Sequence, residues 1–153
     1  MYVTQLILSA LPNIHLTGVL IVAATVVYRV KALYPIYIYV FMMGLFNGFN
    51  TWWLPYLYIW TVLWAFAMLI PKRLPNKVAP IVYMVVCSLH GFLYGILYAP
   101  SQALIMGLDF EKTIAWVAAG LPFDIIHGVS NLLCGILIYP LVKTLNKCEE
   151  LIK

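Results

Sequence analysis

Long apolar runs, separated by short polar breaks, are the feature that most limits what this chain can fold into. Five such runs are expected to cross a membrane, at residues 13–28, 32–49, 53–70, 78–99 and 113–145. Most of them approach the ~20 residues that a helix needs to cross a hydrocarbon core of ~30 Å. A helix also satisfies its own backbone polar groups inside that core. The sequence therefore predicts an all-α fold, a polytopic membrane helical bundle.

The composition agrees with a membrane location. Hydrophobic residues make up 65% of the chain and charged residues 9%, whereas soluble domains carry about 25% charged residues. Such a chain cannot cover its surface with polar groups in water. We expect residues 1–153 to form a single integral membrane domain in the cell (plasma) membrane, with the lipid bilayer as its surroundings. The three cysteines show no paired spacing, so neither a disulfide framework nor a zinc site is expected.

The basic residues fall at alternate breaks between the apolar runs. If the runs alternate in direction, eight of the nine lysine and arginine residues lie on one side: Arg29, Lys31, Lys72, Arg73, Lys77, Lys143, Lys147 and Lys153. The other side receives Lys112, beside Asp109 and Glu111. The positive-inside rule then places the C-terminus of a multi-pass protein in the cytoplasm. Basic residues placed in this way indicate membrane topology, and no nucleic-acid partner is expected.

The last run, 113–145, has two interpretations. As one span it is long, and Pro122 is expected to kink it because proline removes a backbone hydrogen bond. The alternative makes 101–121 a separate span, which buries three charged residues. Each charge at mid-bilayer costs about 2.5–3.5 kcal/mol on insertion scales. We therefore expect one long, kinked span.

The N-terminal residues 1–11 are apolar but too short to cross a membrane, and Asn13 is expected to lie on the outer side. This stub is typical of the outer end of a helix whose inner part is absent. Either the start codon is assigned late or the fold works with five full spans. The prediction is five full transmembrane helices plus an N-terminal partial helix.

Two glycine pairs predict close helix packing. Gly44 and Gly48, and likewise Gly91 and Gly95, are four residues apart, so each pair lies on one helix face. Small residues at this spacing let two helix backbones approach each other in a membrane. Ordinary packing within the bundle is the expected role of both pairs.

An acid, an imidazole and an amide interrupt the last apolar run. Asp124, His127 and Asn131 are spaced i, i+3 and i+7, so one helix face carries all three. Asp124 can accept a hydrogen bond from His127 and fix its tautomer. Ionisable residues inside a membrane are functional by default. The structural alternative is that Asp124 and His127 only bond to each other across the kink at Pro122.

Other polar and aromatic side chains are expected between the outer surface and mid-membrane. They are Asn13, His15, Trp52, Trp53, Tyr56, His90 and Tyr94. Together with Asp124, His127 and Asn131 they predict a substrate-binding pocket that opens to the outside, walled by aromatic rings with a few polar groups. An interfacial aromatic belt also accounts for much of the Trp52–Tyr56 segment.

Enzymatic chemistry has little support in the sequence. There is no HExxH motif, no CxxC motif and no close histidine pair, so no metal, cofactor or catalytic residue is expected. Ser130 or Cys134 beside His127 is a weak basis for a nucleophilic site. No phosphate-binding loop occurs either, so ATP-driven transport would need a partner that hydrolyses ATP.

The stretch LPFDIIHG (121–128), with the basic ending YPLVKTL (139–145), resembles the last helix of the substrate-binding S components of energy-coupling factor (ECF) vitamin transporters. The stretches ALPNIHLTGVLIVAATVVYR (10–29) and FNTWWLPYLYIWTVLW (49–64) also look like that group. The resemblance covers nearly the whole chain, through short and degenerate motifs.

The resemblance implies a six-helix bundle with both termini in the cytoplasm that captures a vitamin-like small molecule from outside. It also implies a transmembrane T component and two ATPase subunits as partners, with the S component toppling to deliver its solute. The family pocket maps onto the ten residues named above, from Asn13 to Asn131. One departure is the first helix, whose Ala-x3-Ala spacing docks on the T component in the family and is missing from the stub here.

Two other functions stay open. One is a scaffold that anchors cell-envelope machinery such as cell-shape proteins, and the other is an intramembrane enzyme. Among possible solutes of a capture subunit, flavins, pterins, pyrimidines and nucleoside-like compounds suit an aromatic pocket about equally well.

Overall fold

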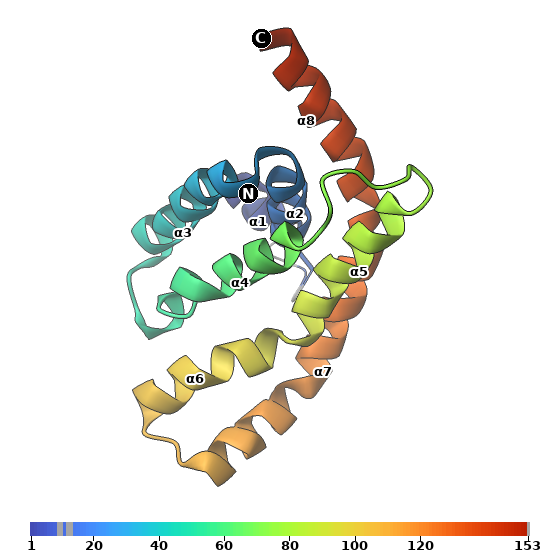
Figure 1. Cartoon of the computed structure of the whole chain (residues 1–153). Coiled ribbons are helices and arrows are strands. Elements are labelled where there is room, and N and C mark those ends of the chain that lie inside the picture. The colour runs from blue at the N-terminus through green and yellow to red at the C-terminus, as the bar shows by residue number, and fades with distance from the viewer. Residues whose placement is uncertain (9–10, 12–13, 153) are drawn as a thin grey trace.

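The computed structural model describes residues 1–8, 11 and 14–152, and every regular element in them is helical. The all-α prediction is therefore confirmed (Figure 1). The α-helices are α1 (Tyr2–Ile7), α2 (Thr17–Tyr28), α3 (Leu33–Asn47), α4 (Tyr56–Met68), α5 (Ala79–Phe92), α6 (Tyr94–Met106), α7 (Phe110–Cys134) and α8 (Ile138–Ile152). Short 3-10 turns at Arg29–Ala32, Thr51–Trp53 and Gly135–Leu137 connect some of them.

Three helical stretches are long and apolar enough to cross a membrane: Thr17–Asn47, Ala79–Met106 and Phe110–Leu151. Each joins more than one of the helices above. Their outward faces are apolar as well, since Tyr34 is 74% exposed and Leu104 86% exposed. A surface of this kind suits lipid and is costly in water. The architecture is therefore consistent with a helical membrane bundle.

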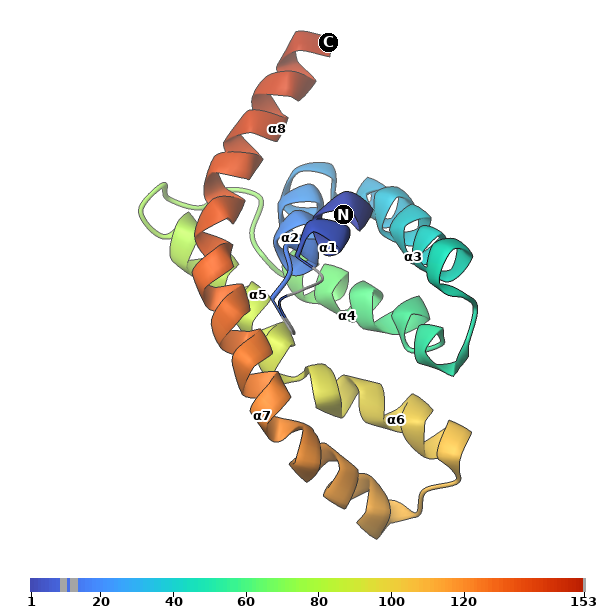
Figure 2. The same cartoon turned by 180° about the vertical axis from the view of Figure 1, so that it is seen from behind.

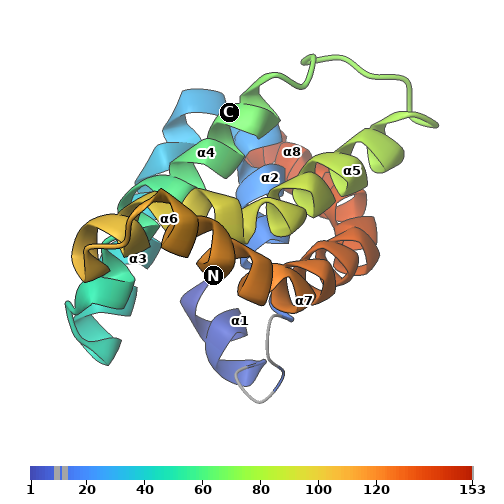
Figure 3. The same cartoon turned by 90° about the horizontal axis from the view of Figure 1, so that it is seen from below.

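Helix α2 forms the centre of the bundle. It packs against α4, α5 and α8, and the view from below shows it enclosed by them (Figure 3). Val19, Ile21 and Val22 have no exposed surface. The helix contains no charged residue and several small ones, which lets neighbouring helices contact it on all sides. α1 is a short helix of six residues beside it, tied to α2 by a hydrogen bond between Thr17 Oγ1 and Gln5 Oε1 (3.2 Å).

The predicted run 78–99 is broken in the structure. α5 ends at Phe92, and α6 starts at Tyr94 in a different direction (Figures 1 and 2). α6 also continues past Ala99 and through Pro100 as far as Met106. The apolar pattern predicts neither the break nor the extension, because the chain is apolar on both sides of Leu93.

The last helical run is long and bends along its course (Figures 1 and 2). α7 continues through Pro122, where proline removes one backbone bond. The chain reverses before it at Gly107, which has a φ of +64°. Asp109 then caps α7 by accepting a hydrogen bond from Lys112 N at 2.8 Å. This turn interrupts 101–121, so the structure does not contain the alternative span.

The two ends of the bundle differ in charge. The α2–α3 turn, the α4–α5 loop and the last turns of α8 lie toward the upper end of Figure 1, whereas the α6–α7 turn lies at the lower end. We call the upper end the basic end, and it carries Arg29, Lys31, Lys72, Arg73, Lys77, Lys143 and Lys147. Lys153, predicted on the same side, lies outside the described residues.

Candidate functional site

Aromatic and imidazole rings from five segments meet inside the bundle. This central cluster consists of His15, Tyr56, Trp60, His90, Tyr94 and His127. The Trp60 ring lies in the middle, with its centroid 5.5 Å from that of Tyr56 and 5.8 Å from that of His90. Its centroid is 6.1 Å from that of His15 and 6.1 Å from that of Tyr94. Rings at these separations are in direct packing contact.

The three histidines come from distant parts of the chain. His15 precedes α2, His90 is on α5 and His127 is on α7. The rings of His15 and His127 meet edge to face, with centroids 4.7 Å apart, and Tyr94 lies 4.9 Å from His127 on a further side. His90 has no exposed surface and His127 only 3%. The fold therefore concentrates imidazoles in a site largely shielded from its surroundings.

His90 has a tautomer set by its neighbour. Its Nε2 lies 3.1 Å from the carbonyl oxygen of Ile59. A carbonyl only accepts hydrogen bonds, so the Nε2–H of His90 donates. In the neutral ring Nδ1 is then an acceptor, and it has no partner among the described residues. His90 thus presents a hydrogen-bond acceptor to the cluster.

Several other buried polar atoms also lack a hydrogen-bond partner among the described residues. They include Trp60 Nε1, His127 Nε2, Asp124 Oδ2 and Asn131 Oδ1. A buried polar atom left unpaired costs about 1–3 kcal/mol. Native interiors keep few such atoms, and those that they keep call for an explanation. Donors and acceptors that the fold itself does not use are typical of a binding site.

Asp124 bonds to a different partner from the one expected. Its Oδ1 accepts a hydrogen bond from the backbone N–H of Gly95 at 3.0 Å. No bond joins it to His127 among the described residues. Gly95 lies in the first turn of α6, where backbone N–H groups have no partner within the helix. Asp124 therefore caps α6 from the neighbouring helix, and it has a structural role beside any functional one.

Asn131 lies on the same face but deeper, at the seam between α5 and α7. Its Nδ2 donates to the carbonyl oxygen of Cys87 at 3.2 Å, and it has no exposed surface. Ser88 Oγ donates to the carbonyl oxygen of Gly128 at 2.9 Å along the same seam. Interhelical bonds of this kind hold membrane helices together.

The glycine pairs have unequal roles. A Cβ at Gly91 would lie 2.8 Å from Gly128 Cα, so this position must stay small for α5 and α7 to cross. A Cβ at Gly95 would collide with the Asp124 carboxylate. The Gly91 and Gly95 pair thus permits close approach. Gly44 and Gly48 instead end α3: Gly48 has a φ of +91°, and the neighbours of Gly44 are rings of its own connecting segment.

The predicted tryptophans separate in the structure. Trp52 stays at the edge of the central cluster, with its ring centroid 5.5 Å from that of Tyr56. Trp53 turns away, and its Nε1 donates to the carbonyl oxygen of Val40 on α3 at 2.8 Å. It is not near the histidines. Asn13, the remaining predicted site residue, lies outside the described residues.

Trp60 was not among the site residues predicted from the sequence. It lies one helical turn from Tyr56, and residues four apart share a helix face. The four-residue spacing places Trp60 beside Tyr56, a predicted pocket residue, and it is the feature of the sequence that could have indicated Trp60. A tryptophan inside an apolar run is ordinary core material, however, so the spacing carried little weight by itself.

A cleft between α6 and α7 reaches the cluster from the end opposite the basic residues. Its volume is about 340 Å³, within the range of small-molecule sites. Tyr94 and Asp124 form its inner wall. Farther out, the rings of Tyr98 and Trp116 stack with centroids 5.9 Å apart, and Gln102 adds an amide. The cleft thus combines flat aromatic surface with a few polar groups.

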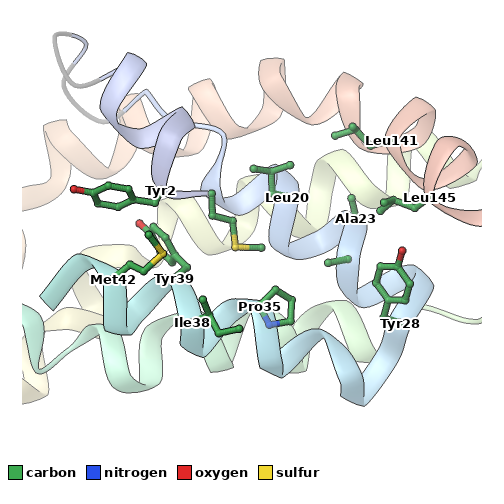
Figure 4. A pocket seen from close by; sticks show the side chains of 12 residues that line it. Tyr2, Leu20, Ala23, Tyr28, Pro35, Ile38, Tyr39, Met42, Leu141 and Leu145 are labelled. Carbon is green, nitrogen blue, oxygen red and sulfur yellow. The ribbon is translucent and has the colours of Figure 1, made fainter. Parts of the chain in front are cut away.

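A second hollow, with a volume of about 410 Å³, lies between α1, α2, α3 and α8 (Figure 4). It is lined by Met1, Tyr2, Leu20, Ala23, Ala24, Tyr28, Pro35, Ile38, Tyr39, Met42, Leu141 and Leu145. The lining of this hollow is almost entirely apolar. This groove suits acyl chains or an apolar helix and offers little to orient a polar solute.

The sequence raised two kinds of enzymatic site, a metal centre and a nucleophile beside His127. No three His, Cys, Asp or Glu side chains among the described residues are placed to hold a metal ion. Ser130 Oγ donates to the carbonyl oxygen of His127 at 3.0 Å, so this bond goes to the backbone and not to the imidazole.

Comparison with known proteins adds no relative. No protein-family model matches the chain, and no curated protein and no solved structure gives a significant match.

Proposed function

We propose that this protein is a membrane-embedded capture subunit that binds a small, vitamin-like solute, in the manner of the ECF S components that its sequence resembles. The observation that supports this most directly is the central cluster. Imidazole and indole nitrogens from distant segments converge there, and several of them have no partner among the described residues. A solute with matching hydrogen-bonding groups would pair them.

The proposed topology has five full spans and an N-terminal partial helix, with the C-terminus in the cytoplasm. The gathering of basic residues at one end of the bundle supports it, since cytoplasmic loops are rich in lysine and arginine. The cleft between α6 and α7 then faces the outside. A solute would enter there and reach the cluster past Tyr94 and Asp124.

The proposed solute is a flat heterocycle that carries both donors and acceptors. Tyr98 and Trp116 offer a stacking surface, whereas Asp124 Oδ2 and His90 Nδ1 offer acceptors. Because the chain has no phosphate-binding loop, uptake against a gradient would depend on partners, a T component and ATPase subunits. The protein itself would not be an enzyme.

Binding to the purified full chain tests the proposal. Flavin, pterin, pyrimidine and nucleoside ligands are titrated, and tryptophan fluorescence is followed because Trp60 and Trp116 lie along the proposed path. We expect one class to bind at micromolar concentration or tighter. His127→Gln keeps the side chain's bulk and should weaken that ligand about tenfold, the loss of one good hydrogen bond.

The control is a pair of matched hydroxyl deletions. Tyr94→Phe should weaken binding several-fold because Tyr94 lies between the cleft and His127. Tyr34→Phe removes the same atom from the exposed outer face of α3 and should have no effect. The proposal fails if no ligand of the panel binds, or if His127→Gln and Tyr94→Phe both bind like the original chain.

A scaffold function has one specific observation in its favour. Asp124 and Asn131 both form interhelical bonds, to Gly95 N and to the carbonyl oxygen of Cys87. A scaffold predicts that Asp124→Asn changes folding or assembly and that no solute is bound by the unmodified chain. Ligand binding by the unmodified chain separates the two functions.

A further inference from the structure

The basic end of the bundle contains a cavity of its own, which shares no lining residue with the central cluster. Its volume is about 530 Å³, and it lies where the α2–α3 turn, the α4–α5 loop and α8 come together. Four cationic side chains line it: Arg29, Lys72, Arg73 and Lys143. The amides of Asn76 and Asn146 add further hydrogen-bonding groups.

No acidic side chain is among the described residues that line this cavity. Asp109 and Glu111 lie at the opposite end of the bundle, and Asp124 is bonded to Gly95. Glu149 and Glu150 follow the cavity on α8 but do not line it. Four positive charges around one hollow, without a carboxylate in its wall, attract an anion.

Two of the cations are held in place by the fold. The Arg29 guanidinium donates through Nη2 to the carbonyl oxygen of Met68 (2.6 Å) and through Nη1 to that of Ile70 (3.2 Å). These bonds use two of its five N–H groups. Arg29 also has a φ of +53°, and its carbonyl accepts a hydrogen bond from Trp64 Nε1 at 3.1 Å. Backbone strain of this kind persists where the surrounding contacts hold it.

Lys143 is placed in a different way. Its ammonium nitrogen lies 4.6 Å from the centroid of the Tyr139 ring, which keeps the charge at the cavity wall. Lys72 and Arg73 are exposed and come from the α4–α5 loop. The cavity thus has a fixed cationic wall on the helices and an adjustable one on the loop. Arginine in particular matches the geometry of phosphate oxygens.

The apolar part of the lining indicates where the anion comes from. Val26, Val27 and Val142 belong to the cavity wall, together with the ring of Tyr83. A free phosphate ion makes no favourable contact with such an apolar surface, whereas the glycerol and upper acyl groups of a lipid pack against it. Basic pockets between membrane helices at the cytoplasmic surface are suited to anionic headgroups. The cavity is also larger than one phosphate group requires.

We propose that this cavity binds the phosphate headgroup of an anionic phospholipid, with Arg29 and Lys143 as fixed contacts and Lys72 and Arg73 closing over it. The inference does not depend on what the central cluster binds. The shared chemistry of the candidate ligands is a phosphate group with a net negative charge, and the experiment below separates lipid from soluble phosphate.

The test uses the full chain in detergent and native mass spectrometry, with phosphatidylglycerol or phosphatidylcholine added at equal concentration. We expect one phosphatidylglycerol to bind with at least tenfold preference. Inorganic phosphate and glycerol 3-phosphate at the same concentration should not displace it. Displacement by either would overturn the lipid assignment, and equal binding of both lipids would overturn the site.

Paired charge deletions separate a site from general attraction. Lys72→Gln with Arg73→Gln removes two cations from the cavity wall. This double substitution should weaken the binding of phosphatidylglycerol at least tenfold, since each cation near an anionic headgroup contributes about 1 kcal/mol to binding. Lys31→Gln with Lys77→Gln removes the same charge from the same end but outside the lining, and should change binding less than twofold. Equal losses in both pairs, or no loss in the first, would overturn the proposal.

Lys143→Gln provides a third variant on a rigid helix. It should weaken phosphatidylglycerol about fivefold, less than the paired loop substitution, because it removes one wall contact. A Lys143→Gln chain that keeps full preference for phosphatidylglycerol contradicts the assigned position of the headgroup. The thermal unfolding temperature without lipid is measured for every variant, so that a folding defect is distinguished from a loss of binding.

Discussion

The central cluster and the basic end differ in how far their polar groups are exposed. In the cluster, polar atoms sit on rings with almost no exposed surface, such as His90 and Trp60. At the basic end, charges such as Lys72 and Arg73 remain exposed beside a hollow. Buried polar groups are costly unless paired, whereas exposed charges contribute little to stability. The comparison predicts that substitutions are poorly tolerated in the first region and well tolerated in the second.

The largest effect is expected from Trp60→Ala. Trp60 contacts rings of four other members of the cluster, so its removal leaves a cavity among buried polar groups. Large aromatic truncations of this kind cost about 3–5 kcal/mol. Thermal unfolding in detergent measures the loss. Trp53→Ala removes an equal volume outside the cluster and should cost clearly less, and equal costs would contradict the central position of Trp60.

The next effect concerns the helix crossing that supports the cluster. Gly91→Val places new atoms against the backbone of Gly128, and neither helix can yield there. Overpacking typically costs about 1–3 kcal/mol. Gly120→Val is the control on α7, because a Cβ at Gly120 meets nothing within 4 Å. If both substitutions lower the unfolding temperature alike, the close crossing of α5 and α7 is wrong.

At the basic end, Arg29→Gln is expected to cost about 1 kcal/mol, below the usual 1.5–3 kcal/mol for charged hydrogen bonds because the side chain is partly exposed. The loss comes from the unpaired carbonyl groups at the end of α4. Lys31→Gln removes the same charge without such bonds and should leave the unfolding temperature unchanged. If Lys31→Gln lowers the unfolding temperature more than Arg29→Gln does, the stabilising role of the Arg29 hydrogen bonds is wrong.

The smallest effect is expected at Asp109, which caps α7 in full exposure. The hydrogen bonds from the Lys112 side chain and backbone lower the pKa of this carboxyl. The contribution of a carboxylate with a lowered pKa is present above its ordinary pKa and is lost as the pH falls through the lowered value. Asp109→Ala should therefore speed amide hydrogen exchange at 110–113 near neutral pH. The difference from the original chain should vanish in acid, and a difference that persists there contradicts the cap.

The sequence predicts parts of both regions. Apolar runs and basic breaks indicate the helical membrane class, and the residues of the basic end follow from the alternation of the runs. His15, His90, Tyr94 and His127 belong to different segments, and all four were expected to line one pocket between the outer surface and mid-membrane. The structure brings these four into one cluster.

Other parts depend on contacts that no local pattern contains. The spacing allows Asp124 to bond to His127 three residues away, but Asp124 caps α6 through Gly95. That bond requires the break between α5 and α6 at Leu93. The sequence does not predict this break, because the residues on both sides of Leu93 are apolar. Trp53 and Trp60 look alike in the sequence, yet one turns to α3 and the other lies among the histidines. The cavity at the basic end requires three distant segments to meet, so residue spacing does not reveal it.

Both regions depend on one proposal, that the α6–α7 cleft and the basic end lie on opposite sides of the membrane. Met106 is exposed next to the α6–α7 turn, and the native Cys148 is exposed on α8. A chain that carries both Met106→Cys and Cys148→Ser is compared with the original chain. Both are expressed in cells, and the labelling of their cysteines by a membrane-impermeant maleimide is measured on intact cells. We predict that the cysteine at position 106 is labelled and that Cys148 in the original chain is labelled only after the membrane is opened. Labelling of Cys148 in intact cells, with position 106 protected, would contradict the account.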